Sequence, residues 1–96
     1  MITIKTTAYR PDSGVKFYKA PEEFLDYRDS SYLDTGKILE ITNEVSEDGL
    51  SKIITVVYLD QESLDEYDVD PRVMANRDAY RTYCIEHRIK RTTEIL

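Results

Sequence analysis

The alternation of apolar and polar residues predicts four strands. At the N-terminus, apolar or β-branched side chains occupy every second position, which predicts a strand over residues 1–9 with one buried face. Residues 37–45 and 52–59 are rich in β-branched residues and flank Asp48-Gly49, a pair that favours a hairpin turn. Residues 89–96 alternate again and predict a closing strand. Together, these segments describe an antiparallel sheet.

One further strand is predicted between the first strand and the first helix. Residues 10–14 contain the Pro, Asp, Ser and Gly that are typical of a hairpin loop. Residues 15–18 then alternate between apolar and polar side chains. This pattern predicts a short extra strand that folds back on the first one.

Helix start signals occupy two of the intervals between strands. Pro21 followed by two glutamates is typical of a helix beginning, and predicts a short amphipathic helix that ends near Tyr32. Residues 63–66 fit a capping box for a short helical turn. Asp70, an N-cap residue, precedes Pro71 and predicts a long helix from residue 71 to about 88.

The resulting order, β-α-β-β-α-β, predicts an α+β, ferredoxin-like fold in which the helices cover one face of the sheet. No repeat or linker divides the chain, so residues 1–96 are expected to form one domain. The strand at 52–59 is apolar on both faces, with Ile53 and Val57 opposite Ile54 and Val56. Since helices cover only one face, a second copy of the chain is expected on the other, as a homodimer through the sheet.

Composition narrows the class of protein. The chain has 96 residues and a net charge of −6, which disfavours binding to nucleic acid because phosphate contacts need clustered basic residues. No apolar run is long enough to cross a membrane. With a single cysteine and no signal-peptide pattern at the start, a cytoplasmic location is expected.

Over residues 37–96 the chain resembles the dimeric α/β-barrel group of ferredoxin-like proteins. The resemblance lies in the hairpin that leads into Asp70-Pro71, the helix that carries Tyr80 and His87, and the final strand. This group includes antibiotic-biosynthesis monooxygenases and haem-degrading enzymes. The resemblance implies a sheet-to-sheet dimer with a ligand cavity between helices and sheet in each subunit. Haem degradation is disfavoured, because only His87 matches the Asn, Trp and His of those enzymes.

One face of the long helix, which also carries the apolar Val73, holds five side chains with polar groups at helical spacing: Asn76, Tyr80, Tyr83, Cys84 and His87. If this face meets the sheet, its polar ends can line a cavity for a small organic ligand. In that hypothesis His87 is a catalytic acid or base, Asn76 and Tyr83 orient the ligand, and Tyr80 forms a wall. The alternative is a core face whose polar groups bond locally.

Basic residues Arg77, Arg81 and Arg88 form a stripe beside that face. Arg77 and Arg81 are candidate contacts to an anionic ligand or an acidic partner, and ion pairs within the chain are the alternative. Cys84 and His87 are too few to predict a metal site, and no cofactor is predicted. Two functions stay open: a dimer that binds or oxidises a small organic ligand, and a non-enzymatic interaction module.

Overall fold

Strand β1 (Ile2–Tyr9) lies between β3 (Ser51–Tyr58) and β4 (Lys90–Ile95) in an antiparallel sheet that β2 (Ile38–Val45) completes. The computed structural model describes residues 1–96, and its strand order is β2-β3-β1-β4. All four main strands predicted from the sequence are confirmed. Gly49, at φ 73°, supplies the left-handed residue of the turn between β2 and β3.

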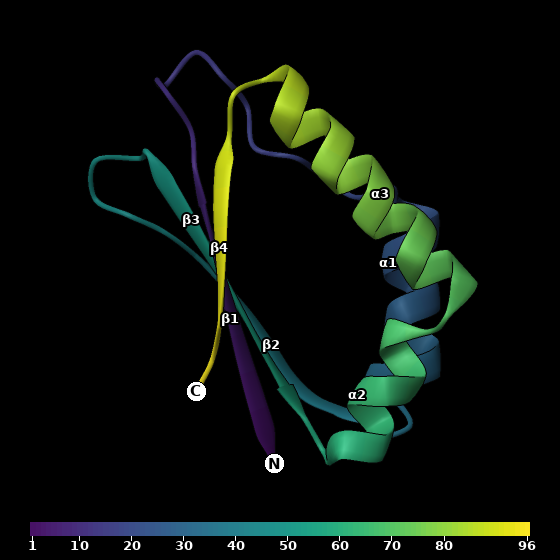
Figure 1. The fold of residues 1–96 in the computed structure, drawn as a ribbon. Coiled ribbons are helices and arrows are strands. Elements are labelled where there is room, and N and C mark those ends of the chain that lie inside the picture. Colours follow the sequence, from purple (N-terminus) through teal and green to yellow (C-terminus); the bar gives the residue numbers. More distant parts are fainter.

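The helices all lie on one side of this sheet (Figure 1). They are α1 (Glu22–Arg28), which a π-helical turn η1 (Asp29–Leu33) continues, α2 (Gln61–Asp68) and α3 (Pro71–Glu86). The predicted Asp70 cap is confirmed, because its side chain accepts a hydrogen bond from the Arg72 N–H. The α+β, ferredoxin-like fold is therefore confirmed.

Two local predictions are wrong. Residues 15–18 are not a strand: β1 already has β3 and β4 on its two sides, so no free edge lies beside it. The side chains of Val15 and Phe17 pack against a buried cluster instead. Helix α2 begins earlier than the capping box at Ser63 predicted, because Asp60 caps it by accepting a hydrogen bond from the Ser63 N–H at 2.8 Å.

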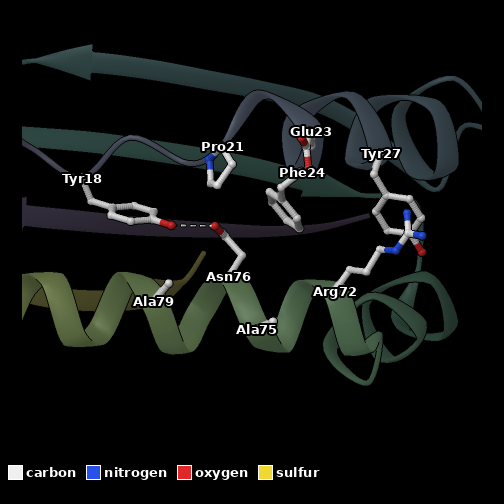
Figure 2. A pocket seen from close by; sticks show the side chains of 9 residues that line it. All are labelled: Tyr18, Pro21, Glu23, Phe24, Tyr27, Arg72, Ala75, Asn76 and Ala79. Carbon is white, nitrogen blue, oxygen red and sulfur yellow. Dashed lines mark hydrogen bonds between the residues drawn. The ribbon is translucent and has the colours of Figure 1, made fainter.

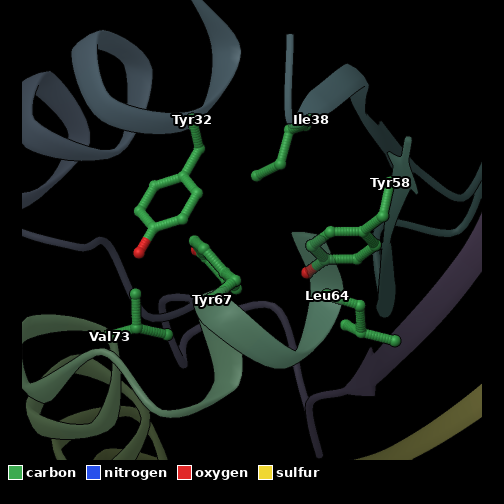
Figure 3. Packing of buried hydrophobic residues seen from close by; sticks show 6 residues of the cluster. All are labelled: Tyr32, Ile38, Tyr58, Leu64, Tyr67 and Val73. Atoms are coloured by element: carbon green, nitrogen blue, oxygen red, sulfur yellow. The ribbon is translucent and has the colours of Figure 1, made fainter. Parts of the chain in front are cut away.

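Two separate clusters hold the helices on the sheet. The larger lies at one end, where α2 and the start of α3 meet β2 and β3 (Figure 3), and contains Tyr32, Ile38, Tyr58, Leu64, Tyr67 and Val73. The rings of Tyr32 and Tyr67 meet edge to face with centroids 4.8 Å apart, and the ring of Tyr58 is tilted against that of Tyr67. The smaller cluster, Ala8, Cys84 and Ile89, lies at the other end of α3. Between the two clusters the inner face of the sheet is only half-buried.

The buried tyrosines of the larger cluster predict alkaline sensitivity. Burial raises the pKa of Tyr58 and of Tyr32 above the ordinary value near 10. These phenols therefore keep their protons in the fold, whereas the same phenols in the unfolded chain ionise. Their contribution is complete below about pH 10 and is lost as the pH rises above that value.

We expect the free energy of unfolding in urea to fall between pH 9 and pH 11, and to fall less steeply in Tyr58→Phe than in the original chain. A matched control is Tyr9→Phe, because Tyr9 is 48% exposed. Equal slopes for all three proteins would contradict the assignment.

No helix of the chain combines the length and the apolar character that a membrane crossing requires.

Candidate functional site

Strand register divides the inner face of the sheet, which faces the helices, into rows of changing chemistry. Nearest the hairpin turn, Lys52 pairs with Ala8, and Ala8 pairs with Arg91 on its other side. We call this the basic row. The next row is mostly polar and contains Asn43, Ile54, Thr6 and Thr93. Beyond it lies an apolar row of Ile41, Val56, Ile4 and Ile95. The last row, which includes Ile38 and Tyr58, enters the larger core cluster.

Helix α3 spans this face above the rows. Its buried residues are Val73 and Cys84, three turns apart, so the stripe between them carries Arg77 and Tyr80 toward the sheet. The ends of this stripe belong to the two core clusters. Its middle is not packed onto the sheet, because Arg77 stays exposed and Tyr80 only half-buried.

The unfilled space forms a hollow of about 840 Å³ between the helices and the sheet. Side chains from all four strands, α1, α2 and α3 line it. The strand contribution is that of the rows already described: Ile4, Thr6, Asn43, Ile54, Val56, Arg91 and Thr93 among them. The aromatic contribution is Tyr18, Phe24, Tyr58, Tyr67 and Tyr80. Of the 26 lining residues 14 are hydrophobic and the others are polar or charged, so the hollow offers both apolar walls and polar groups to a small organic molecule.

A second, smaller cavity of about 430 Å³ lies between α1 and α3 (Figure 2). It shares Tyr18, Phe24 and Asn76 with the hollow, so these side chains form a common wall. The Tyr18 hydroxyl donates a hydrogen bond to Asn76 Oδ1 at 3.0 Å, and the Tyr18 ring stacks on Tyr80 with centroids 4.9 Å apart. Tyr18 thus holds the segment before α1 against α3.

Four of the five predicted ligand contacts line the hollow: Asn76, Arg77, Tyr80 and Arg81. Tyr83 does not, because its hydroxyl donates to the Lys16 carbonyl at 2.6 Å. Burial, the main cause, raises the pKa of Tyr80, although Arg91 acts in the opposite direction. Tyr80 thus presents a neutral phenol at ordinary pH.

His87 lies outside both cavities. It is the C-cap residue of α3, is exposed, and stacks on the Tyr83 ring with centroids 4.0 Å apart. Its Nδ1 lies 2.9 Å from the Tyr83 carbonyl oxygen. The catalytic role of His87 stays a prediction that the geometry does not connect with the hollow.

The predicted arginine stripe is divided between two environments. Arg77 pairs with Asp68 at 2.7 Å and Arg81 pairs with Asp78, so the ion-pair alternative is confirmed for both. Both also line the hollow. Arg88 lies beyond α3 with a positive φ of 58° and lines neither cavity. The three arginines therefore do not form one continuous outer surface.

Sequence reasoning about the helix missed the strand residues of the site. Lys52 and Arg91 were not singled out, nor were Thr6, Asn43 and Thr93. A signal was present, because each lies at an inward position of its strand, in phase with apolar residues such as Ile4 and Ile54. A polar side chain at an inward position of a strand is an informative sign of a site.

Comparison with solved structures confirms the fold. The chain is similar to SnoaB, a cofactor-independent oxygenase from Streptomyces nogalater, with a TM-score of 0.63 and 14% identity over 99% of this chain and 89% of the other. A Mycobacterium tuberculosis protein gives 0.65 and 14% over 100% and 93%. A dimeric ferredoxin-like protein from an uncultured marine organism gives 0.63 and 14% over 99% and 92%. The resemblance to this group is therefore confirmed at the level of fold.

No family model matches the sequence, and no curated protein is similar to it.

Proposed function

We propose that this chain is a ligand-binding domain that takes a small organic molecule into the hollow between α3 and the sheet, and that it works as a homodimer. Ligand binding in the hollow is supported by the incomplete cover of the inner face of the sheet. Ile4, Ile54 and Val56 lie on the one face that the helices cover, yet all three are only half-buried. Removing apolar surface from water is favourable by about 25 cal/mol per Å². Binding of an apolar molecule against these residues would therefore be favourable.

The size of the hollow supports the same conclusion. Ligand sites commonly measure about 300 to 1,000 Å³, and this hollow measures about 840 Å³. The rings of Tyr58, Tyr67 and Tyr80 offer flat apolar walls with hydroxyl ends. An aromatic or alicyclic molecule fits such walls better than a flexible polar one.

The proposal is tested with a neutral aromatic probe, 2-naphthamide, titrated into the intact protein by isothermal titration calorimetry. We expect saturable binding with one site per chain and a negative heat-capacity change, because apolar surface is buried. Absence of binding at millimolar probe would contradict the proposed function.

Filling the hollow should prevent this binding. We expect Val56→Trp to weaken the affinity for 2-naphthamide about tenfold or more, because the indole occupies the apolar row that the probe would contact. The matched control is Ile85→Trp, which adds the same side chain where Ile85 is 73% exposed on α3. Equal affinities for the two variants would place the probe outside the hollow.

The homodimer rests on the outer face of the sheet, opposite the helices. Since Lys52, Ile54 and Val56 line the hollow, Ile53 and Val57 point to the outer face. No helix covers that face (Figure 1). The dimeric ferredoxin-like protein with the same fold supports this arrangement.

A further inference from the structure

The lining of the hollow differs in charge from the rest of the protein. Of the 13 basic residues in the chain, six line the hollow: Lys19, Arg28, Lys52, Arg77, Arg81 and Arg91. Of the 19 acidic residues, only Asp68 and Asp78 do. The lining thus carries a formal charge of +4 in a chain whose net charge is −6. A concave site with walls of one sign concentrates the potential and attracts the opposite charge.

Three of these cations are already neutralised. Arg28 pairs with Asp29 at 3.1 Å, Arg77 with Asp68 at 2.7 Å, and Arg81 with Asp78. Lys19, Lys52 and Arg91 have no carboxylate within ion-pair distance. The unpaired positive charge is therefore concentrated on the basic row of the sheet and on the segment before α1.

Arg91 is held in place on one side of the basic row. Its guanidinium carbon lies 4.5 Å from the centroid of the Tyr80 ring, a cation–π contact that leaves its N–H donors free. Lys52 lies two strands away, about 10 Å across the sheet at the usual strand spacing. Ala8, between them, is buried in the smaller core cluster, so the two cations meet a common anionic group where their long side chains extend beyond that cluster into the hollow.

The neighbouring row supplies the neutral donors that an anion also needs. Thr6 and Thr93 are cross-strand partners, and each brings a hydroxyl to the inner face next to Arg91. Asn43 brings an amide on the side of Lys52. Ile54 is the one apolar member of this row, whereas the following row, with Val56 and Ile4, is entirely apolar. The hollow therefore has a basic and donor-rich end and an apolar end.

We propose that the ligand of the hollow is an amphipathic organic anion, with a carboxylate or a similar anionic group bound by Arg91 and Lys52 and an apolar body against Val56, Ile4 and the tyrosines. This inference rests on the proposed function and names its ligand class. Arg91 offers a planar fork that matches a carboxylate, and Lys52 adds a point charge. Arg91 and Lys52 thus set the selectivity for an anion, whereas the apolar row sets affinity.

The experiment compares 2-naphthoate with 2-naphthamide, which share the same ring system and differ in charge. In low salt we expect the original chain to bind 2-naphthoate about tenfold more tightly. The double variant Arg91→Met, Lys52→Met should lose this preference and keep its affinity for 2-naphthamide within about twofold, because methionine retains an apolar stem. The matched control is Lys90→Met, a neighbour of Arg91 whose side chain points to the opposite face of β4.

The outcomes separate the two proposals. Equal binding of both probes by the original chain, or a preference that survives in the double variant, would overturn the anion assignment and leave the proposed function intact. Failure of 2-naphthamide to bind would overturn the proposed function and, with it, the anion assignment that rests on it. Retained 2-naphthamide binding by the double variant shows that the hollow is still formed, so a lost preference then reflects charge. The preference should also shrink about severalfold between 20 and 300 mM NaCl, since salt screens partly exposed charges.

Discussion

Replacing Asp70 with alanine should cost about 3 kcal/mol of unfolding free energy, the largest loss we expect from any single polar residue of this chain. Asp70 is 9% exposed and joins three elements. Its Oδ2 accepts hydrogen bonds from the hydroxyls of Tyr27 at 2.5 Å and Tyr32 at 2.6 Å. Its Oδ1 accepts the Arg72 N–H at 2.8 Å and caps α3.

The expected magnitude follows from two of these bonds. Loss of an N-cap costs about 1 kcal/mol. A buried hydroxyl left without an acceptor costs about 1 to 3 kcal/mol, and Tyr32 is only 4% exposed. Because domains of this size are stable by only about 5 to 15 kcal/mol, the variant should unfold at clearly lower urea concentration.

A matched control is Asp60→Ala. Asp60 caps α2 by the same kind of bond, to the Ser63 N–H, but accepts no phenol. We expect Asp60→Ala to lose less unfolding free energy than Asp70→Ala. A similar loss in both variants would contradict the stabilising role of the hydrogen bonds from the tyrosines to Asp70. A double-mutant cycle between Asp70→Asn and Tyr32→Phe should show a favourable coupling energy.

The same carboxylate predicts a pH dependence. Burial alone would raise the pKa of Asp70, but hydrogen bonds from Tyr27, Tyr32 and the backbone outweigh it and lower the pKa below the ordinary value. A lowered native pKa stabilises the fold above about pH 4. The stability advantage of the original chain over Asp70→Asn should therefore diminish as the pH falls below about 4. An advantage that stayed constant to pH 2 would contradict this assignment.

The fold was predictable because local signals agree with one another. Alternation in β1 and β3, the Asp48-Gly49 turn and the Asp70-Pro71 helix start each depend on nearby residues. The prediction of an extra strand at residues 15–18 was wrong because the alternation of its residues does not show whether a sheet edge is free for pairing. Its apolar residues are used in packing against Ala8 and Cys84 instead.

The site was only half predictable for a related reason. A helical wheel of α3 identified Asn76 and Tyr80, but the wheel does not show where the helix stands away from the sheet. That separation depends on the two clusters at the ends of α3, which come from distant segments. The basic row likewise needs the pairing of β1 with both β3 and β4. His87 shares the helical phase but comes after the last turn, where the chain leaves α3.

Replacing Val57 with lysine should convert the proposed homodimer to a monomer without unfolding the chain. Val57 lies on the outer face, one residue before the end of β3, and its cross-strand partners are Glu40 on β2 and Thr3 on β1. In a separate chain, lysine at this position can pair with Glu40, so the monomer should tolerate it. In a sheet-to-sheet dimer the same ammonium would be buried, at about 3 kcal/mol or more. This is roughly a hundredfold or greater increase in the dimer dissociation constant.

Native mass spectrometry and light scattering distinguish the two states, because the dimer has twice the 11.2 kDa mass of the chain. The matched control is Ile85→Lys, which places the same charge on the exposed side of α3, where Ile85 is 73% exposed, and should stay dimeric. A monomeric original chain at 50 µM would refute the homodimer. A dimeric Val57→Lys would refute the outer face as its interface, because a sheet-to-sheet contact would bury the ammonium group of each subunit, which is costly even beside Glu40. Since the hollow lies on the inner face, binding of 2-naphthamide should survive in the monomer, and the assembly and the ligand site are thus separable in one variant.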